Sequence, residues 1–318
     1  MAERKLALVT GCSTGVGLHT AARLAEAGWQ VVATMRDPAK AAALNAECAR
    51  LGVAVEVLAL DVADQHSIDS TTAAVLARHG GIDLLVNNAG AGFLGSIEQT
   101  SDADLRRTME VNFFGVWNMT RAVLAGMRGQ GAGRIIAITS VGGLLAQPFN
   151  EAYCAAKFAV EGMIEGFAPL ARQMGIDVCL VEPGPINTEF VASVRQNSAA
   201  SFAAMVAPYN RLAANYMASA GDVFATHGQS GDDIARIVVA LAGAEKPPLR
   251  TITSDFAKAM VAPKVVDESG ENVVAVFASR LAGKAPASEQ RECEAKSGAL
   301  FAAAREAVQV AGEAGFGQ

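Results

Sequence analysis

The sequence predicts a doubly wound α/β fold of Rossmann type with a parallel sheet, and three observations carry that prediction. Short β-branched apolar runs alternate with longer alanine-rich segments of helical period, a pattern typical of repeated βαβ units. Runs such as IIAIT and VCLVE are apolar almost throughout, as expected for strands that helices cover on both faces. A glycine-rich turn, TGCSTGVG, follows the first run and precedes a helical segment, which is the order of a dinucleotide-binding unit.

The strands follow from the apolar runs, and helices are expected in the segments between them. The expected strands are Lys5–Thr10, Gln30–Thr34, Ala54–Leu60, Leu84–Asn87, Arg134–Thr139 and Asp177–Glu182. From Thr188 to about Gln229 the chain is rich in Ala, Ser, Phe, Tyr and Met without a strand pattern, which predicts a lid of mobile helices and loops. We therefore expect one catalytic domain over residues 1–284, with this lid at about 188–229, and a helical or partly disordered extension over 285–318.

Composition excludes several classes of function. The 318 residues are 51% apolar, which is enough for the core of one large domain. A net charge of -6 without Lys or Arg runs argues against a nucleic-acid partner. No apolar stretch reaches the roughly 20 residues of a membrane span, and the start MAERKLALVTG lacks a secretory signal pattern, so a cytoplasmic location is expected. The five cysteines and four histidines show no ligand spacing, and no metal is predicted.

The glycine turn predicts the cofactor class. Gly11, Gly15 and Gly17 let the backbone approach a pyrophosphate at the N-terminus of the following helix. The second strand ends in Arg36 rather than an acidic residue, and an arginine neutralises a 2′-phosphate. We therefore expect NADP(H), with Arg36 and Ser13 holding this phosphate. NAD(H) stays open because the adjacent Asp37 is a suitable acceptor for a free ribose hydroxyl.

A serine, a tyrosine and a lysine predict the chemistry. Tyr153 and Lys157 are four residues apart in a helical pattern and so share one face. Ser140 follows an apolar strand, at the sheet edge where open α/β folds place their sites. Hydride transfer to a ketone requires a proton donor, and the charge of Lys157 is expected to lower the pKa of the Tyr153 phenol from its usual value of about 10. Ser140 is expected to hold the substrate oxygen.

Together, the pattern TGxxxGxG, the NNAG of Asn87–Gly90 and the Ser140, Tyr153 and Lys157 set resemble the short-chain dehydrogenase/reductase family over about Lys5 to Glu189. The resemblance implies about seven strands. It also implies that Asn112 orders a water that links Lys157 to solvent, and that Asp61 holds the adenine, although a helix cap is an alternative role for Asp61. The cofactor contacts that it implies are Gly11, Ser13, Thr14, Gly15, Val16, Gly17, Asp61, Val62, Asn88, Ala89, Gly90, Tyr153, Lys157, Pro183, Gly184, Ile186 and Thr188.

The stretches SVGGLLAQPFNEAYCAAKFAVEG and ATMRDP resemble the branch of this family that contains 17β-hydroxysteroid dehydrogenase type 1 and the photoreceptor retinol dehydrogenases. This resemblance implies a bulky apolar, steroid-like or retinoid-like ketone or alcohol. The expected substrate contacts are Ser140, Leu144, Phe149, Tyr153, Pro185, Tyr209, Val223 and Phe224. The histidine and glutamate with which steroid members of the branch grip an estrogen have no counterpart in the lid stretch Met205–Phe224 or in VFASRLAG, so estrogen specificity is not predicted.

Two other functions stay open at this stage. One is reduction of a broad range of carbonyls or of ketones on acyl carrier protein, although the latter needs a basic docking surface that the acidic chain does not predict. The other is a non-catalytic sensor that binds NADP(H), which the intact Ser140, Tyr153 and Lys157 disfavour. The resemblance also implies a homodimer or homotetramer formed through helices that begin near Asp104 and Asn150.

Overall fold

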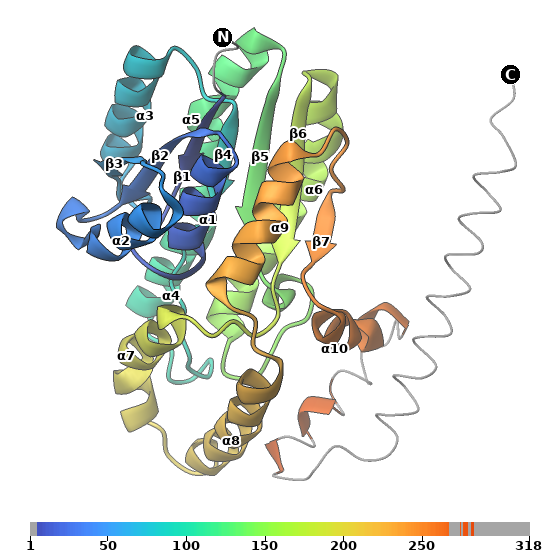
Figure 1. Ribbon diagram of the computed structural model, residues 1–318. Helices are drawn as coiled ribbons and strands as arrows, with labels where there is room; N and C mark the ends of the chain where they lie inside the picture. The colour runs from blue at the N-terminus through green and yellow to red at the C-terminus, as the bar shows by residue number, and fades with distance from the viewer. Residues whose placement is uncertain (1–4, 267–273, 275, 279–280, 283–318) are drawn as a thin grey trace, which may run out of the picture.

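The computed structural model describes residues 5–266, 274, 276–278 and 281–282, and its centre is a seven-stranded parallel sheet (Figure 1). The strand order is β3-β2-β1-β4-β5-β6-β7. The strands are β1 (Leu6–Val9), β2 (Gln30–Met35), β3 (Glu56–Ala59), β4 (Leu84–Asn87), β5 (Gly133–Ile138), β6 (Ile176–Glu182) and β7 (Arg250–Ile252). The order reverses between β1 and β4, so the sheet is doubly wound, as predicted, and a binding site is expected at this point.

The six strands expected from the apolar runs are confirmed, and their ends differ by at most two residues from the expected ones. Their side chains are apolar on both faces because helices cover both faces of the sheet. The seventh strand, β7, did not stand out in the sequence pattern. It has only three residues, all half-buried, and so shows no apolar run.

Helices form a layer on each side of the sheet (Figure 1). One layer contains α1 (Gly15–Glu26), α2 (Ala42–Leu51) and α9 (Gly231–Gly243), whose apolar residues form one core with the sheet. The other contains α3 (Gln65–His79), α5 (Gly115–Gln130) and α6 (Glu151–Gln173), which form the second core. Next to α6 lies α4 (Asp102–Met109), which continues through a π-helical turn at Glu110–Phe114 into α5. These layers leave the carboxyl ends of the strands accessible.

The stretch that was predicted to form a lid contains α7 (Glu189–Ala203) and α8 (Tyr209–His227), which lie beyond the carboxyl ends of the strands (Figure 1). Ser198 anchors α7, because its buried Oγ accepts a hydrogen bond from the Leu94 backbone N–H at 2.7 Å. The last described helix is α10 (Asp255–Val266). Among the described helices, none combines the length and the apolar character that crossing a bilayer requires. The predicted extension over 285–318 lies outside the described residues.

Candidate active site

The turn between β1 and α1 brings the backbone close to its neighbours and leaves the start of α1 facing a ligand. Gly11 has a φ of 72°, and a Cβ on it would lie 2.8 Å from the Ala89 Cα. A Cβ on Gly17 would lie 2.2 Å from the Asn88 Nδ2, so no side chain fits at either position. No side chain caps α1 at Thr14. Its first backbone N–H groups, at the positive end of the helix dipole, therefore suit an anion such as a pyrophosphate.

The segment after β4 holds this turn in place. The Thr10 Oγ1 accepts hydrogen bonds from the backbone N–H groups of Asn88 and Ala89, both at 3.0 Å. The Asn88 Nδ2 donates to the carbonyl oxygens of Thr10 at 2.8 Å and Gly11 at 3.0 Å. Asn88 therefore stabilises the glycine turn in addition to bordering the cleft described next.

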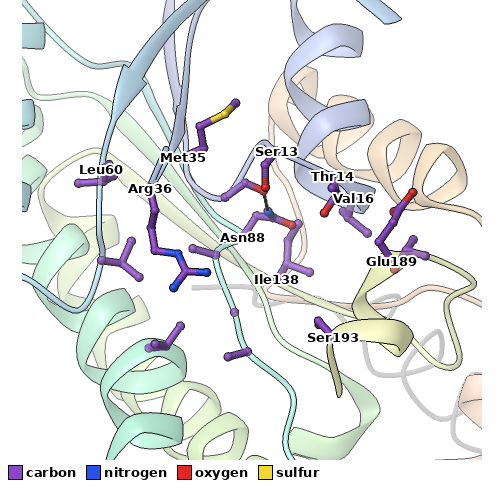
Figure 2. Close-up of a pocket in the computed structure, with 18 of the residues that line it drawn as sticks. Ser13, Thr14, Val16, Met35, Arg36, Leu60, Asn88, Ile138, Glu189 and Ser193 are labelled. Atoms are coloured by element: carbon purple, nitrogen blue, oxygen red, sulfur yellow. Dashed lines mark hydrogen bonds between the residues drawn. The ribbon is translucent and has the colours of Figure 1, made fainter. Parts of the chain in front are cut away.

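A cleft of about 450 Å³ lies at the carboxyl ends of β1, β2, β4 and β5 (Figure 2), a volume typical of cofactor and ligand sites. Fourteen predicted residues line it, namely Gly11, Ser13, Thr14, Gly15, Val16, Arg36, Asp61, Val62, Asn88, Ala89, Gly90, Tyr153, Lys157 and Thr188. The prediction missed Met35, Leu60, Ala91, Val111, Ile138, Thr139, Glu189 and Ser193, which also line it. Most of these are apolar, and an apolar side chain next to a strand end carries no chemical signal in a single sequence.

Two charged residues, Arg36 and Asp37, follow the end of β2. Arg36 directly follows β2, is exposed and borders the cleft (Figure 2). Within the described residues its guanidinium forms no ion pair. Asp37 is engaged elsewhere, because its Oδ1 accepts a hydrogen bond from the Ala39 backbone N–H at 3.0 Å and caps a short helix. Of these two charged residues, Arg36 is the one that lines the cleft.

The structure decides one of the two roles that the sequence left open for Asp61, the helix cap. Asp61 lines the cleft, and its Oδ1 also accepts a hydrogen bond from the Ala63 backbone N–H at 3.0 Å. The side chain that caps α3 is Asp64. Asp61 therefore stabilises the turn before α3 without capping that helix, and its contact with the adenine stays a prediction.

Helix α6 presents Tyr153 and Lys157 to the cleft, as their spacing predicts. Lys157 is 5% exposed, and its Nζ donates to the Ile138 carbonyl oxygen at 3.1 Å. Burial lowers the pKa of Lys157 to about 8, and Glu161 partly opposes that shift. Ser140 lies at the end of β5, where its Oγ accepts a hydrogen bond from the Gly142 backbone N–H at 3.0 Å.

The pKa of Tyr153 differs from the expectation. Burial raises this pKa, and the hydrogen bond with Ser140 opposes the rise. The Lys157 ammonium is directed at the Ile138 carbonyl, and its Nζ lies 5.7 Å from the centre of the tyrosine ring, so the expected lowering of this pKa by Lys157 is not seen in the protein alone. The hydrogen bond with Ser140 favours the phenolate.

Asn112 lies in the π-helical turn and is fully buried. Its Nδ2 donates to the carbonyl oxygens of Ala91 at 2.7 Å and Thr108 at 2.9 Å. Its Oδ1 accepts from the Ala91 backbone N–H at 3.2 Å. The amide thus fastens the loop after β4 next to Lys157, and the expected ordered water stays a prediction.

Several predicted contacts do not line the cleft. Of the predicted substrate residues only Tyr153 borders it, whereas Ser140, Leu144, Phe149, Pro185, Tyr209, Val223 and Phe224 do not. Phe149 is 5% exposed and packs against Tyr216 of α8, with ring centres 6.0 Å apart. Leu144 and Tyr209 pack in small apolar clusters beside the lid. Gly17, Pro183, Gly184 and Ile186 also lie outside the lining, so Thr188 is the one predicted cofactor contact after β6 that lines the cleft.

The fold also brings together a group that sequence spacing did not suggest. Ligand atoms of His19, Glu47 and Asp232 lie within 4.8 Å of one another. Arginines already neutralise both carboxylates, because Arg23 binds Asp232 at 2.6 Å and Arg50 binds Glu47 at 2.7 Å. An ion pair therefore connects α1 with α9, and His19 of α1 lies 3.4 Å from Glu47 of α2.

Comparison with known proteins agrees with this geometry. The family model for short chain dehydrogenases matches residues 5–199. Retinol dehydrogenase 8 from Bos taurus is 37% identical over 272 residues, which cover 83% of this chain and 86% of that protein. The 17-beta-hydroxysteroid dehydrogenase type 1 from Homo sapiens is 34% identical over 291 residues, covering 89% of this chain and 88% of that protein.

Solved structures with a bound nicotinamide cofactor share the fold. A short chain dehydrogenase/reductase from Burkholderia phymatum in complex with NAD has a TM-score of 0.72 at 25% identity and covers 85% of this chain and 97% of its own. A metagenomic short-chain oxidoreductase in complex with NADP has a TM-score of 0.61 at 29% identity, with coverages of 78% and 96%. The chain is accordingly an NAD(P)-dependent oxidoreductase of alcohols and ketones, and it belongs to the short-chain dehydrogenase family.

Proposed function

We propose that this enzyme transfers hydride between NADP(H) and a bulky apolar ketone or secondary alcohol, with Tyr153, Lys157, Ser140 and Asn112 as the catalytic set. The observation that carries the proposal is that Tyr153 and Lys157 line the same cleft as the glycine turn. The nicotinamide supplies the hydride in the direction of reduction. Tyr153 donates its phenolic proton to the carbonyl oxygen, and Ser140 holds that oxygen by a hydrogen bond as negative charge develops on it.

The residues of the cleft fit a dinucleotide with a 2′-phosphate. Gly11 and Gly17 let the turn pack closely against its neighbours, where a Cβ would clash, and the start of α1 offers uncapped N–H groups to the pyrophosphate. Arg36 offers a guanidinium at the edge where a 2′-phosphate is expected, while Asp37 caps a short helix and does not line the cleft. These contacts support NADP(H) over NAD(H), because a guanidinium binds a phosphate by charge-assisted hydrogen bonds.

The substrate class rests on the lid and on the named relatives. Apolar residues of α7 and α8 and of the loop after β5 form a cluster beyond the carboxyl ends of the strands, including Phe149, Met205 and Tyr216. The similar proteins from Bos taurus and Homo sapiens are named for retinol and for a 17β-hydroxysteroid. A steroid-like or retinoid-like substrate is supported by both observations.

The test is the decay of NADPH absorbance, with NADH in parallel, against 17-keto and 3-keto steroids, retinal and small aromatic ketones. We expect turnover of at least one bulky apolar carbonyl with a preference for NADPH. Activity on small ketones alone would contradict the bulky substrate and support broad carbonyl reduction. NADPH binding without turnover of any carbonyl would support the non-catalytic sensor.

A homo-oligomer located in the cytoplasm completes the proposal. Leu105 of α4, Phe114 and Trp117 around the start of α5, and Leu170 of α6 are large exposed apolar side chains, on the helices through which the resemblance implies association. Burial of these side chains between copies would remove apolar surface from water. Light scattering of the purified protein is expected to give the mass of a dimer or tetramer, and a monomer at micromolar concentration would contradict this part.

A further inference from the structure

Three charged side chains that the proposed chemistry does not use lie next to Lys157. Glu161 follows Lys157 by one turn on α6, Glu182 ends β6 and Arg250 begins β7. Glu161 is 4% exposed and Glu182 is fully buried. Two carboxyl groups so far from water are costly to keep unless they are paired with a cation or hold a proton.

Hydrogen bonds hold this cluster in one arrangement. The Glu161 Oε1 accepts from the Thr139 Oγ1 at 2.6 Å, and its Oε2 accepts from the Arg250 Nε at 3.0 Å. The same Nε lies 3.3 Å from the Glu182 Oε1. A single guanidinium therefore serves two buried carboxyl groups, and its other end binds the exposed Glu165 at 2.5 Å.

The surroundings of the two buried carboxyl groups favour a proton shared between them, because both lie away from water and one Arg250 Nε serves both. Burial raises the pKa of Glu182, and the neighbouring charge of Glu161 raises it further. Burial also raises the pKa of Glu161. Within the described residues neither Glu182 oxygen accepts a hydrogen bond from a donor side chain, whereas the two carboxyl groups lie within hydrogen-bonding reach of each other. A hydrogen bond between them requires one proton, which leaves the pair with one negative charge.

We propose that Glu161 is a positioning residue for the catalytic lysine, because its share of this single negative charge stabilises the ammonium form of Lys157 at the cleft. The inference rests on the proposed roles of Tyr153 and Lys157. The groups that face the Lys157 side chain are Tyr153 and Glu161 on its own helix and the Ile138 carbonyl of β5. Glu161 is the anion among them.

The groups that face Glu161 come from four elements. They are Lys157 and Glu165 on α6, Thr139 after β5, Glu182 on β6 and Arg250 on β7. Glu161→Gln removes the carboxylate one turn from Lys157, and the remaining negative charge moves to Glu182 on the neighbouring strand. Since loss of a nearby anion favours the neutral amine, the pKa of Lys157 is expected to fall by about one unit.

The chain supplies a matched control for this experiment. Glu165 binds the same arginine from the same helix but is exposed, so Glu165→Gln removes one partner of Arg250 and leaves the buried pair intact. Glu182→Gln removes the group that competes with Glu161 for the negative charge, and it leaves that charge on Glu161. Glu161→Asp keeps a carboxylate at the position of interest.

The first measurement is the pH titration of Lys157 in the full unliganded chain. It is monitored by ¹³C NMR of lysines labelled at the ε carbon, and the Lys157 signal is assigned with Lys157→Arg. We expect the midpoint to fall by about one pH unit in Glu161→Gln, to stay unchanged in Glu165→Gln, and not to fall in Glu182→Gln or Glu161→Asp. An unchanged midpoint in Glu161→Gln, or an equal fall in Glu165→Gln, would overturn the inference. If Glu161→Gln does not fold, a fall in Glu182→Gln overturns it.

The second measurement is the pH dependence of kcat/KM for reduction of whichever carbonyl the wild-type enzyme accepts. Its alkaline limb is expected to move to lower pH in Glu161→Gln and to coincide with the wild type in Glu165→Gln. A merely structural glutamate would lower stability without moving this limb. Failure of the wild type to reduce any carbonyl would refute the proposed function, while the lysine titration would still decide the role of Glu161.

Discussion

Replacement of Lys157 by methionine is expected to abolish turnover and to make the unliganded protein more stable at neutral pH. The lysine is 5% exposed, and burial lowers its pKa from 10.5 to about 8. Below pH 8 the lysine is charged in both the folded and the unfolded chain, so folding carries the whole cost of burying the ammonium. Between pH 8 and 10.5 the unfolded chain binds the extra proton, and the stability of the folded state therefore rises with pH.

The size of the effect follows from that difference in pKa. A difference of 2.5 units between 10.5 and about 8 corresponds to about 3 kcal/mol at pH 7, since one unit is about 1.4 kcal/mol. Methionine loses the hydrogen bond from Nζ to the Ile138 carbonyl, which costs about 1 kcal/mol. The expected net gain for Lys157→Met is therefore about 2 kcal/mol at pH 7. At pH 9.5 the same difference in pKa leaves a cost of about 1 kcal/mol for burying the ammonium. The lost hydrogen bond offsets this cost, so Lys157→Met is expected to gain almost no stability at that pH.

The assay is equilibrium unfolding in urea without cofactor, for the wild type and Lys157→Met, at pH 7 and pH 9.5. NADPH-dependent reduction is measured on the same samples. A gain at pH 7 that disappears at pH 9.5, together with lost turnover, is the expected result. Lower stability of Lys157→Met at pH 7, or a gain of equal size at both pH values, would refute the argument that burial of the ammonium opposes folding.

Three further substitutions, the last with a matched control, test individual parts of the site. Tyr153→Phe removes the phenolic proton and is expected to abolish turnover while NADPH binding, followed by cofactor fluorescence, is retained; normal turnover would exclude Tyr153 as the proton donor. Arg36→Ala is expected to weaken NADPH binding about tenfold or more and to change NADH binding little. Both affinities are measured by titration of the cofactor. An equal loss of affinity for the two cofactors would mean that another residue holds the 2′-phosphate. Gly17→Ala introduces a Cβ that would clash with the Asn88 Nδ2, so it is expected to lower thermal stability and NADPH affinity. In the control Gly166→Ala the Cβ meets nothing within 4 Å, and the free energy of unfolding is expected to rise by about 1 kcal/mol. Similar effects of both variants would contradict the role of close backbone approach at Gly17.

The strands and the cofactor turn were predictable because their signals are local. Each of the six predicted strands is a short apolar run, and the glycine turn lies between a strand and a helix that are both evident in the sequence. The strand β7 was not evident because Arg250–Ile252 contains a charged residue and is half-buried. Tyr153 and Lys157 were predictable because a helical spacing of four places both on one face.

Features built from distant segments were not predictable in this way. Phe149 was expected at the substrate, but it has a positive φ of 59° and packs under α8, which depends on how the lid folds back over the loop after β5. Glu161, Glu182 and Arg250 lie on three elements, and their contact depends on the order of β5, β6 and β7 in the sheet. The direction of the Lys157 ammonium toward the Ile138 carbonyl likewise requires the packed structure.

Burial acts on the two central groups of the site in the same sense, since it favours the neutral form of each. It raises the pKa of Tyr153 and lowers the pKa of Lys157. A neutral phenol is the proton donor that reduction needs, so for Tyr153 burial and function agree. The proposed chemistry needs Lys157 as an ammonium, and the same burial disfavours that charged form. For Lys157, therefore, burial and function conflict. The buried carboxylate of Glu161, one turn away, reduces that conflict because it stabilises the ammonium without bringing a carboxylate to the cleft. Its own charge is limited by the proton shared with Glu182 and by Arg250. This role gives a reason for a charged cluster, costly to bury, behind the lysine.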